Sequence, residues 1–200
     1  MFWNLKDMGE PQIQADRTDY SVEEYHAMQE RSTLRLEYFN GVIRAMSGGN
    51  RNHARILTNT LVGMSNKLAG SDCEVYGEQL KILSPKEPSY LFPDVMAVCG
   101  PETLEPGRDD VLTNPTLIIE VLSPSTMHYD FVKKYDRYKQ IPSLQEYVLI
   151  SQDQPRIELR SSQDDWGHIQ VVKGMNASVT FASVGITLPL EEIYRQVKFE

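Results

Sequence analysis

Apolar and polar residues alternate in short blocks along the chain, and the spacing within each block predicts a helix or a strand. Ser21, with Glu24 three residues later, has the form of a capping box and predicts a short helix over residues 21–30. Further on, Asn40-Gly41 lies between two apolar segments and provides the positive φ angles of a tight turn. The sequence therefore predicts a β-hairpin over residues 36–46.

Longer apolar patterns predict the rest of the secondary structure. Apolar residues recur at helical spacing over 56–68, and further helices are predicted over 129–140 and 190–197. Strands are predicted over 73–76, 80–83, 95–98, 117–122, 147–150, 156–160 and 169–172. Because strands and helices are mixed along the chain, the fold class is α+β or mixed α/β. Residues 1–18 are polar and irregular, which predicts an N-terminal arm before a single domain over 19–200.

The composition narrows the class of protein. The 200 residues are 40% hydrophobic and 24% charged, as in a globular chain. No apolar run approaches the roughly 20 residues that span a bilayer, and the N-terminus lacks the pattern of a secretory signal, so no membrane partner is expected. Cys73 and Cys99 are too few for a disulfide scaffold or a four-cysteine zinc site. We expect them to pack as small apolar side chains in a protein of the reducing cytoplasm.

One carboxylate lies inside an apolar strand. Residues 117–122 are apolar on both faces except for Glu120, and burial of a charge is costly unless it is paired or binds a metal. Upstream, Asp94 opens another apolar strand, so the two carboxylates meet if these strands are neighbours. Two oxygen ligands with little sulfur or imidazole nearby suit Mg²⁺ or Mn²⁺. The alternative from the residues alone is structural: Asp94 caps a strand, and Glu120 pairs with a buried Arg or Lys.

The predicted helix over 129–140 has Asp130, Lys134 and Tyr138 at spacings of four residues, hence on one face. From that face, Lys134 can reach back toward the two carboxylates. Its ammonium can orient a water and stabilise charge on a phosphate. An ordinary solvated Asp130–Lys134 ion pair is the alternative.

Positive charge is concentrated in residues 31–55. The net charge of the whole chain is −8, which excludes a uniformly basic surface for nucleic acid. This segment nevertheless has five arginines against the single acidic residue Glu37, a local charge of +4. The arginines are Arg31, Arg35, Arg44, Arg51 and Arg55. Such a segment offers phosphate oxygens a favourable surface, or it only adds solubility and ion pairs. His53, at the start of the next helix, is a proton carrier, an anion ligand or simply a polar residue at a helix end.

Four segments together resemble a known family. They are residues 35–53 with Glu37, Gly41 and His53, residues 92–95 around Pro93-Asp94, residues 114–126 around Glu120, and residues 130–147 with Lys134 and Tyr138. Over about residues 19–195 the chain resembles the restriction-endonuclease family designated domain of unknown function 820, of the Uma type, which is abundant in cyanobacteria. That family belongs to the PD-(D/E)XK phosphodiesterase superfamily.

The resemblance implies a restriction-endonuclease-like core, a mixed β-sheet flanked by helices with its site at one sheet edge. Asp94 and Glu120 correspond to the acidic motif residues that bind the metal, with the Val121 carbonyl as a third ligand. The usual motif lysine would fall at Leu122, so its role passes to Lys134 on the following helix, with Lys133 ranked second. The remaining correspondences are Glu37 to an additional acidic residue, His53 to the family histidine, and Gln79 and Lys81 to a further polar position.

These expectations define a function. The chain is expected to be a Mg²⁺- or Mn²⁺-dependent endonuclease that hydrolyses phosphodiester bonds of DNA, with Asp94, Glu120, Lys134, Glu37 and His53 as catalytic residues. Arg35, Arg51 and Arg55 are expected to bind flanking phosphates. A homodimer is expected by resemblance, because two sites related by a two-fold axis suit cleavage of two strands. The alternative function is a non-catalytic protein of the same fold that binds nucleic acid or another partner.

Overall fold

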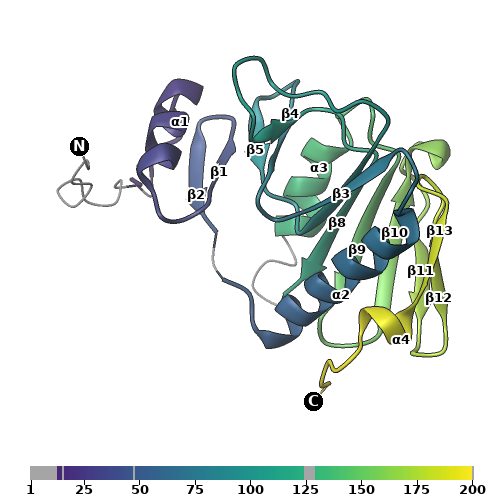
Figure 1. Cartoon of the computed structure of the whole chain (residues 1–200). Helices are drawn as coiled ribbons and strands as arrows, with labels where there is room; N and C mark the ends of the chain where they lie inside the picture. The colour runs from purple at the N-terminus through teal and green to yellow at the C-terminus, as the bar shows by residue number, and fades with distance from the viewer. Residues whose placement is uncertain (1–12, 15, 47, 124–128, 200) are drawn as a thin grey trace, which may run out of the picture.

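The computed structural model describes residues 13–14, 16–46, 48–123 and 129–199, which form three sheets and a few helices (Figure 1). The helices are α1 (Val22–Arg31), α2 (Arg51–Leu68), the π-helix η2 (Tyr129–Lys134), α3 (Tyr135–Tyr138), the 3₁₀ turn η3 (Ser162–Asp164) and α4 (Leu190–Ile193). The strands are β1 (Leu36–Phe39), β2 (Val42–Ala45), β3 (Cys73–Gly77), β4 (Lys81–Ser84), β5 (Ser89–Leu91), β6 (Val95–Cys99), β7 (Val111–Leu112), β8 (Leu117–Leu122), β9 (Glu146–Ser151), β10 (Arg156–Ser161), β11 (Gln170–Lys173), β12 (Ser178–Phe181) and β13 (Ile186–Pro189). The fold is mixed α+β, as predicted.

The central sheet has six strands in the order β11-β10-β9-β8-β6-β3. The β8–β9 pair is parallel and the other neighbours are antiparallel, so the sheet is mixed. A second sheet, β2-β1-β5-β4-β7, continues into the first through residues 92–94, and β12 pairs with β13. Strand β8 thus lies inside the sheet between β9 and β6. Glu120 therefore lies on an interior strand, near the end of β8.

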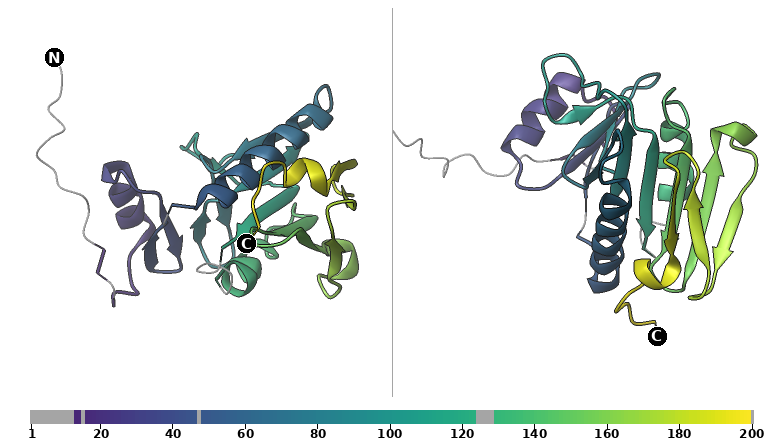
Figure 2. Two further views of the ribbon diagram at one scale, coloured as in Figure 1. Left: turned by 90° about the horizontal axis from the view of Figure 1, so that it is seen from below. Right: turned by 45° about the vertical axis from the view of Figure 1, so that its right-hand side comes forward.

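Two hydrophobic cores lie on opposite faces of the six-stranded sheet. On β8, Leu117, Ile119 and Val121 point into the core that contains residues of α2 and α4. Ile118 and Leu122 point into the other core, which contains Tyr138 of α3. Figure 2 shows α2 and α4 together on one side of the sheet and α3 on the other. Because side chains alternate along a strand, Glu120 faces the side of η2 and α3.

The local predictions for the first half of the chain are confirmed. Ser21 and Glu24 form a capping box at the start of α1. The β1–β2 hairpin turns at Asn40 and Gly41, whose φ angles are 40° and 94°. Helix α2 begins after Asn50, whose side chain accepts the backbone N–H of His53 at 2.9 Å.

Two predicted helices differ in the structure. The predicted helix over 129–140 is a π-helix that passes into a single α-helical turn and ends at Tyr138. A π segment widens the turn, and such segments are frequent at functional sites. The predicted closing helix over 190–197 ends at Ile193, because the chain reverses at Gln196 with a φ of 61°.

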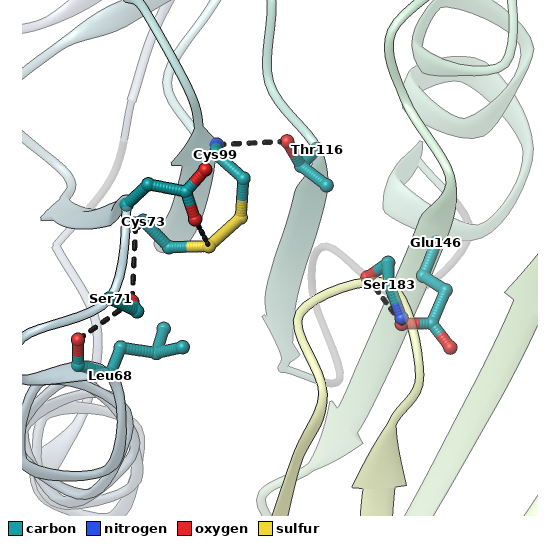
Figure 3. Close-up of a disulfide and its surroundings, with 8 residues drawn as sticks. Leu68, Ser71, Cys73, Cys99, Thr116, Glu146 and Ser183 are labelled. Carbon is teal, nitrogen blue, oxygen red and sulfur yellow. Dashed lines mark hydrogen bonds between the residues drawn. A yellow bond between two sulfur atoms is a disulfide. The ribbon is translucent and has the colours of Figure 1, made fainter.

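The cysteines form a disulfide, so the prediction that they pack as separate apolar side chains is wrong. Cys73 on β3 and Cys99 on β6 lie directly opposite each other, with their Cα atoms 3.9 Å apart (Figure 3). The bond ties the last strand of the sheet to its neighbour. Thr116 accepts the N–H of Cys99 at 3.0 Å, which extends the connection to the residue before β8. The disulfide also removes the cysteine argument for a reducing compartment.

Most of the predicted N-terminal arm lies outside the described residues, and the division into arm and domain stays a prediction. No helix in the described part of the chain is long and apolar enough to cross a membrane.

Replacement of Gly41 by alanine should destabilise the hairpin that carries Glu37. A Cβ at Gly41 would lie 2.3 Å from the carbonyl oxygen of Thr18, and the φ of 94° is strained for any L side chain. We expect Gly41→Ala to lower the free energy of unfolding by about 1–3 kcal/mol in urea titrations. Gly48→Ala is the control, because a Cβ there meets nothing within 4 Å. Equal effects of the two substitutions would contradict this account of the turn.

Candidate active site

Glu120 lies near the C-terminal end of β8 with 2% of its surface exposed. Burial alone does not define a site. Glu146, on the neighbouring strand β9, is also buried, but its carboxylate accepts the backbone N–H groups of Ala182 and Ser183 at 3.2 and 2.9 Å and binds the Ser183 hydroxyl (Figure 3). Glu146 therefore has a structural role in holding a loop, whereas Glu120 is surrounded by ionisable side chains.

The Lys134 ammonium lies between two carboxylates. Its Nζ is 3.0 Å from Oε1 of Glu37 and 3.2 Å from Oε1 of Glu120. All three side chains are almost completely buried. Glu37 comes from β1, Glu120 from β8 and Lys134 from the end of η2, so one cation joins the two large sheets and the π-helix. Because buried charges require such compensation, this contact positions all three groups.

Neutral donors complete the surroundings of the two glutamates. The Tyr138 hydroxyl donates to Oε1 of Glu120 at 2.8 Å, and the backbone N–H of Phe92 donates to Oε1 of Glu37 at 3.2 Å. Burial, and then the negative charges of Glu120 and Glu37, raise the pKa of Tyr138 well above its ordinary value. Tyr138 thus remains a hydrogen-bond donor throughout the physiological pH range.

Asp94 is fixed beside Glu120 by the sheet. Val95 pairs with Ile119 in the antiparallel β6–β8 ladder. Asp94, the residue before Val95, therefore lies opposite Glu120, the residue after Ile119. Oδ2 of Asp94 accepts the backbone N–H of Val121 at 2.6 Å, and Oδ1 is 3.2 Å from Nε2 of His53. The two predicted acidic strand positions therefore lie on neighbouring strands at the same end of the sheet.

His53 reaches Asp94 from the first turn of α2, and 16% of its side chain is exposed. Burial lowers the pKa of His53, but the hydrogen bond and charge of Asp94, together with the charge of Glu78, outweigh burial and leave that pKa raised. The imidazole therefore takes up a proton more readily than a free histidine. This proton strengthens its contact with Asp94.

The structure separates the remaining predicted residues from this centre or gives them other contacts. Lys133 is exposed, unlike Lys134. Arg35 pairs with Glu78 at 2.9 Å, and Arg55 donates to the backbone carbonyl of Gln196. Arg51 is exposed on the first turn of α2.

Gln79 and Lys81, the residues predicted for a further polar position of the site, also lie apart from the centre. Gln79 is exposed, whereas Lys81 is buried and its Nζ lies 2.5 Å from Oδ2 of Asp110. Burial raises the pKa of Asp110, but Arg108 and Lys81 lower it to about 2, so this pair is charged at neutral pH. Lys81 therefore belongs to an ion-pair cluster with Asp110 and Arg108, separate from the ion pairs of Lys134.

Three contributors were not predicted. Tyr138 was placed on the face of Lys134 by its spacing, but its hydroxyl bond to Glu120 depends on the packing of α3 against the sheet. The charge of Glu78 helps to raise the pKa of His53, and the Phe92 contact with Glu37 is made by a backbone N–H. A backbone donor carries no residue-specific signal in a sequence.

The donor atoms fit a hard divalent cation. In the described part of the chain, no three His, Cys, Asp or Glu side chains are grouped as a ready-made metal cage. Mg²⁺ is usually held by only one or two protein carboxylates, with waters and substrate phosphates as the other ligands. Asp94 and Glu120, together with the carbonyl of Val121, match that donor set in type and number.

Comparison with solved structures defines the class of fold. The structure is similar to the crystal structure of a "putative nuclease belonging to DUF820" from Anabaena variabilis ATCC 29413, with a TM-score of 0.73. The match covers 90% of this chain and 99% of that chain, at 18% sequence identity. The polypeptide therefore has the fold of that protein.

Sequence comparison gives the family. Residues 22–191 match the model of the Uma2 family, described as "Putative restriction endonuclease". Two curated relatives from Synechocystis sp. (strain ATCC 27184 / PCC 6803 / Kazusa) are similar over most of their length. Uncharacterized protein slr1290 is 35% identical over 90% of this chain and 93% of its own, and uncharacterized protein sll1609 is 30% identical over 82% and 93%. The chain belongs to the Uma2 family, as the sequence motifs predicted.

Asp94 should control the titration of His53 in metal-free protein. Asp94→Asn removes the charge that raises the pKa of His53 while the burial that lowers it remains, so this pKa should fall. Two-dimensional NMR of the histidine ring signals against pH measures the change. His26 is the internal control, because its pKa is already lowered, first by burial and then by Arg108, and it should not respond.

The same contact links pH to stability. Because the folded-state pKa of His53 is raised, its contribution to stability is complete below about pH 6.5, the unfolded value, and is lost as the pH rises through the folded value. The unfolding free energy of wild type relative to Asp94→Asn should therefore decrease over that range. A constant difference between the two proteins would contradict the ion pair.

Proposed function

We propose that this protein is an endonuclease that hydrolyses phosphodiester bonds of DNA with the help of Mg²⁺ or Mn²⁺. The observation that carries the proposal is the buried Lys134 ammonium between Glu37 and Glu120, one strand away from Asp94. Membership of the Uma2 family supports the same chemistry. Asp94, which the antiparallel β6–β8 ladder sets opposite Glu120, adds the second carboxylate that a divalent cation would use at this end of the sheet.

In this proposal Asp94, Glu120 and the Val121 carbonyl hold the cation. A bound divalent cation would supply Lewis-acid stabilisation of the scissile phosphate and a more acidic water. The β6–β8 ladder keeps the two carboxylates adjacent, and the Val121 N–H orients Asp94. The protein therefore presents the ligands in a geometry fixed by its backbone.

Lys134 is the proposed cationic catalyst. Its ammonium orients the attacking water and stabilises the negative charge that develops on the phosphate. Glu37 supports this role, because its contact with Nζ holds the lysine at the ends of the strands. Tyr138 holds Glu120 from the other side by a hydrogen bond.

His53 and Arg51 are the proposed phosphate contacts. Both lie on the first turn of α2, and protonated His53 is favoured by Asp94. Arg35 and Arg55 are bonded to Glu78 and to the Gln196 carbonyl, so their proposed contribution is to hold this surface in place. We further propose that two copies form a homodimer, as expected from the sequence.

Substitutions at the centre should abolish cleavage, and Lys134→Ala should also lower the free energy of unfolding, because it removes the cation that Glu37 and Glu120 share. Asp94→Ala, Glu120→Ala and Lys134→Ala should each reduce nicking of supercoiled plasmid, in Mg²⁺ and in Mn²⁺, by about two orders of magnitude or more. Lys133→Ala is the matched control, because it removes the adjacent but exposed ammonium. Circular dichroism and light scattering of each variant report the fold and the oligomeric state.

The pattern of results separates the two functions. Nicking by all three variants at the wild-type rate would disprove the assignment of the site. If folded wild-type protein cuts neither supercoiled plasmid nor single-stranded DNA with either metal, the nuclease proposal fails, and DNA binding without cleavage would then support the non-catalytic alternative. A monomeric mass at micromolar concentration would contradict the homodimer.

Metal binding provides an independent test. Isothermal titration calorimetry should detect Mn²⁺ binding to wild type, and Glu120→Ala should weaken it by about tenfold or more. Glu74→Ala is the control, since Glu74 is an exposed carboxylate on β3. Equal affinity of wild type and Glu120→Ala would place the metal elsewhere.

A further inference from the structure

A second feature lies on another side of the helix that carries Lys134. A cavity of about 540 Å³ opens between α3, the end of the β4–β5 turn and the loop after η3. Two of its lining residues are aromatic, two are lysines, and the others are an amide and a carboxylate. They are Tyr135, Trp166, Lys86, Lys139, Gln140 and Asp165. None of these residues belongs to the centre described above.

Trp166 is held in the wall of this cavity by its backbone. Asp165 and Trp166 are consecutive residues with positive φ angles, 50° and 62°, which are uncommon for residues with side chains. The turn is stabilised because the Trp166 N–H donates to the Ser161 carbonyl at 2.9 Å and the Tyr135 hydroxyl donates to the Trp166 carbonyl at 3.1 Å. A residue kept in this conformation is fixed in position, and its indole is only partly buried.

Tyr135 supports the indole. The two rings meet edge to face, with centroids 6.3 Å apart and an interplanar angle of 77°. Tyr135 also stacks on Tyr147, and the Arg160 guanidinium lies 4.6 Å from its centroid. These contacts hold the tyrosine ring in place, and its edge-to-face contact supports the indole of Trp166.

The charge around the cavity selects an anionic ligand. Lys86 and Lys139 are exposed at its wall, and among the lining residues that the structure describes Asp165 is the only carboxylate. Lys139 lies 5.2 Å from the Tyr135 centroid and also forms an exposed pair with Asp136 at 2.7 Å, a kind of pair that contributes little. In a chain of net charge −8, an aromatic cavity with two lysines disfavours a cationic ligand. A flat ring that carries a phosphate matches both features.

The position of the cavity favours a strand over a free nucleotide. Along η2 and α3, Lys134 and Tyr138 point to Glu120, whereas the next residues, Tyr135 and Lys139, line the cavity. Tyr135 is the residue that follows the proposed catalytic Lys134 in the sequence. A chain of nucleotides that has its scissile phosphate at Lys134 can continue along the same short helix.

We propose that Trp166, supported by Tyr135, is a stacking platform for an unpaired base of the nucleic-acid strand, with Lys86 and Lys139 as contacts for its phosphates. The inference rests on the proposed nuclease function and names the form of substrate that the site takes, a strand with unpaired bases beside the cleavage point. Stacking on an aromatic ring needs an exposed base face, which a paired duplex does not offer.

Tryptophan fluorescence tests the platform without cleavage. The chain has two tryptophans, so Trp3→Phe leaves Trp166 as the only one. In this background and in EDTA, a short single-stranded oligothymidylate should quench Trp166 emission, and the same strand annealed to its complement should quench it much less. Double substitution Lys86→Ala with Lys139→Ala should weaken binding by about fivefold or more and reduce its salt dependence. Lys67→Ala, an exposed lysine of α2, is the control.

Three outcomes would overturn the platform. The first is that the single strand does not bind. The second is that anisotropy of a labelled strand shows binding while Trp166 emission does not change. The third is that thymidine monophosphate quenches Trp166 equally at the same nucleotide concentration. The last result would make the cavity a nucleotide site.

Kinetics separates this inference from the nuclease proposal. Asp94→Ala should keep the quenching and lose cleavage. Trp166→Leu should raise KM for a substrate with unpaired bases while kcat is kept, and Trp166→Phe should restore much of the lost affinity because it keeps a ring. Quenching without cleavage would defeat the nuclease alone, and cleavage without quenching would defeat the platform alone.

Discussion

The ion pairs of Lys134 are the contacts on which the arrangement of the site depends. One buried ammonium lies within 3.2 Å of carboxylates from two different sheets, and it enters from a π-helix that belongs to neither sheet. Without it, Glu37 and Glu120 would be two buried negative charges close together, a state with a high desolvation and repulsion cost. The lysine therefore joins the two sheets at the point where the chemistry is proposed.

The backbone determines where the other groups lie. Residues 92–94 carry the chain from one large sheet to the other, and along them the Phe92 N–H binds Glu37 and Asp94 accepts the Val121 N–H. Helix α2 then brings His53 onto Asp94 from the opposite core. Residues from five separate parts of the sequence thus meet at one end of a sheet, and each is held by a hydrogen bond or ion pair rather than by a loop alone.

Much of this arrangement could be predicted from the sequence. An apolar strand with one carboxylate identified Glu120, and the motif order identified Asp94, Lys134 and Glu37. Patterns of spacing did not predict the π-helix, because a wider turn leaves the apolar periodicity nearly unchanged over six residues. The Cys73–Cys99 disulfide depends on the register of β3 against β6, which two cysteines 26 residues apart do not reveal. Three hydrogen bonds of the site likewise depend on the packed structure. They are the bond from the Tyr138 hydroxyl to Glu120 and the bonds from the backbone N–H groups of Phe92 and Val121 to Glu37 and Asp94.

Restoration of the ammonium at position 134 tests the central claim most directly. Lys134→Cys should fold and lack metal-dependent nicking, and its thiol can be aminoethylated in the unfolded, non-reduced protein, where Cys73 and Cys99 remain joined. The account predicts that the refolded, aminoethylated variant regains nicking, because the modified side chain again places a cation between Glu37 and Glu120. Undiminished nicking before modification, or a folded aminoethylated protein that stays inactive, would contradict it.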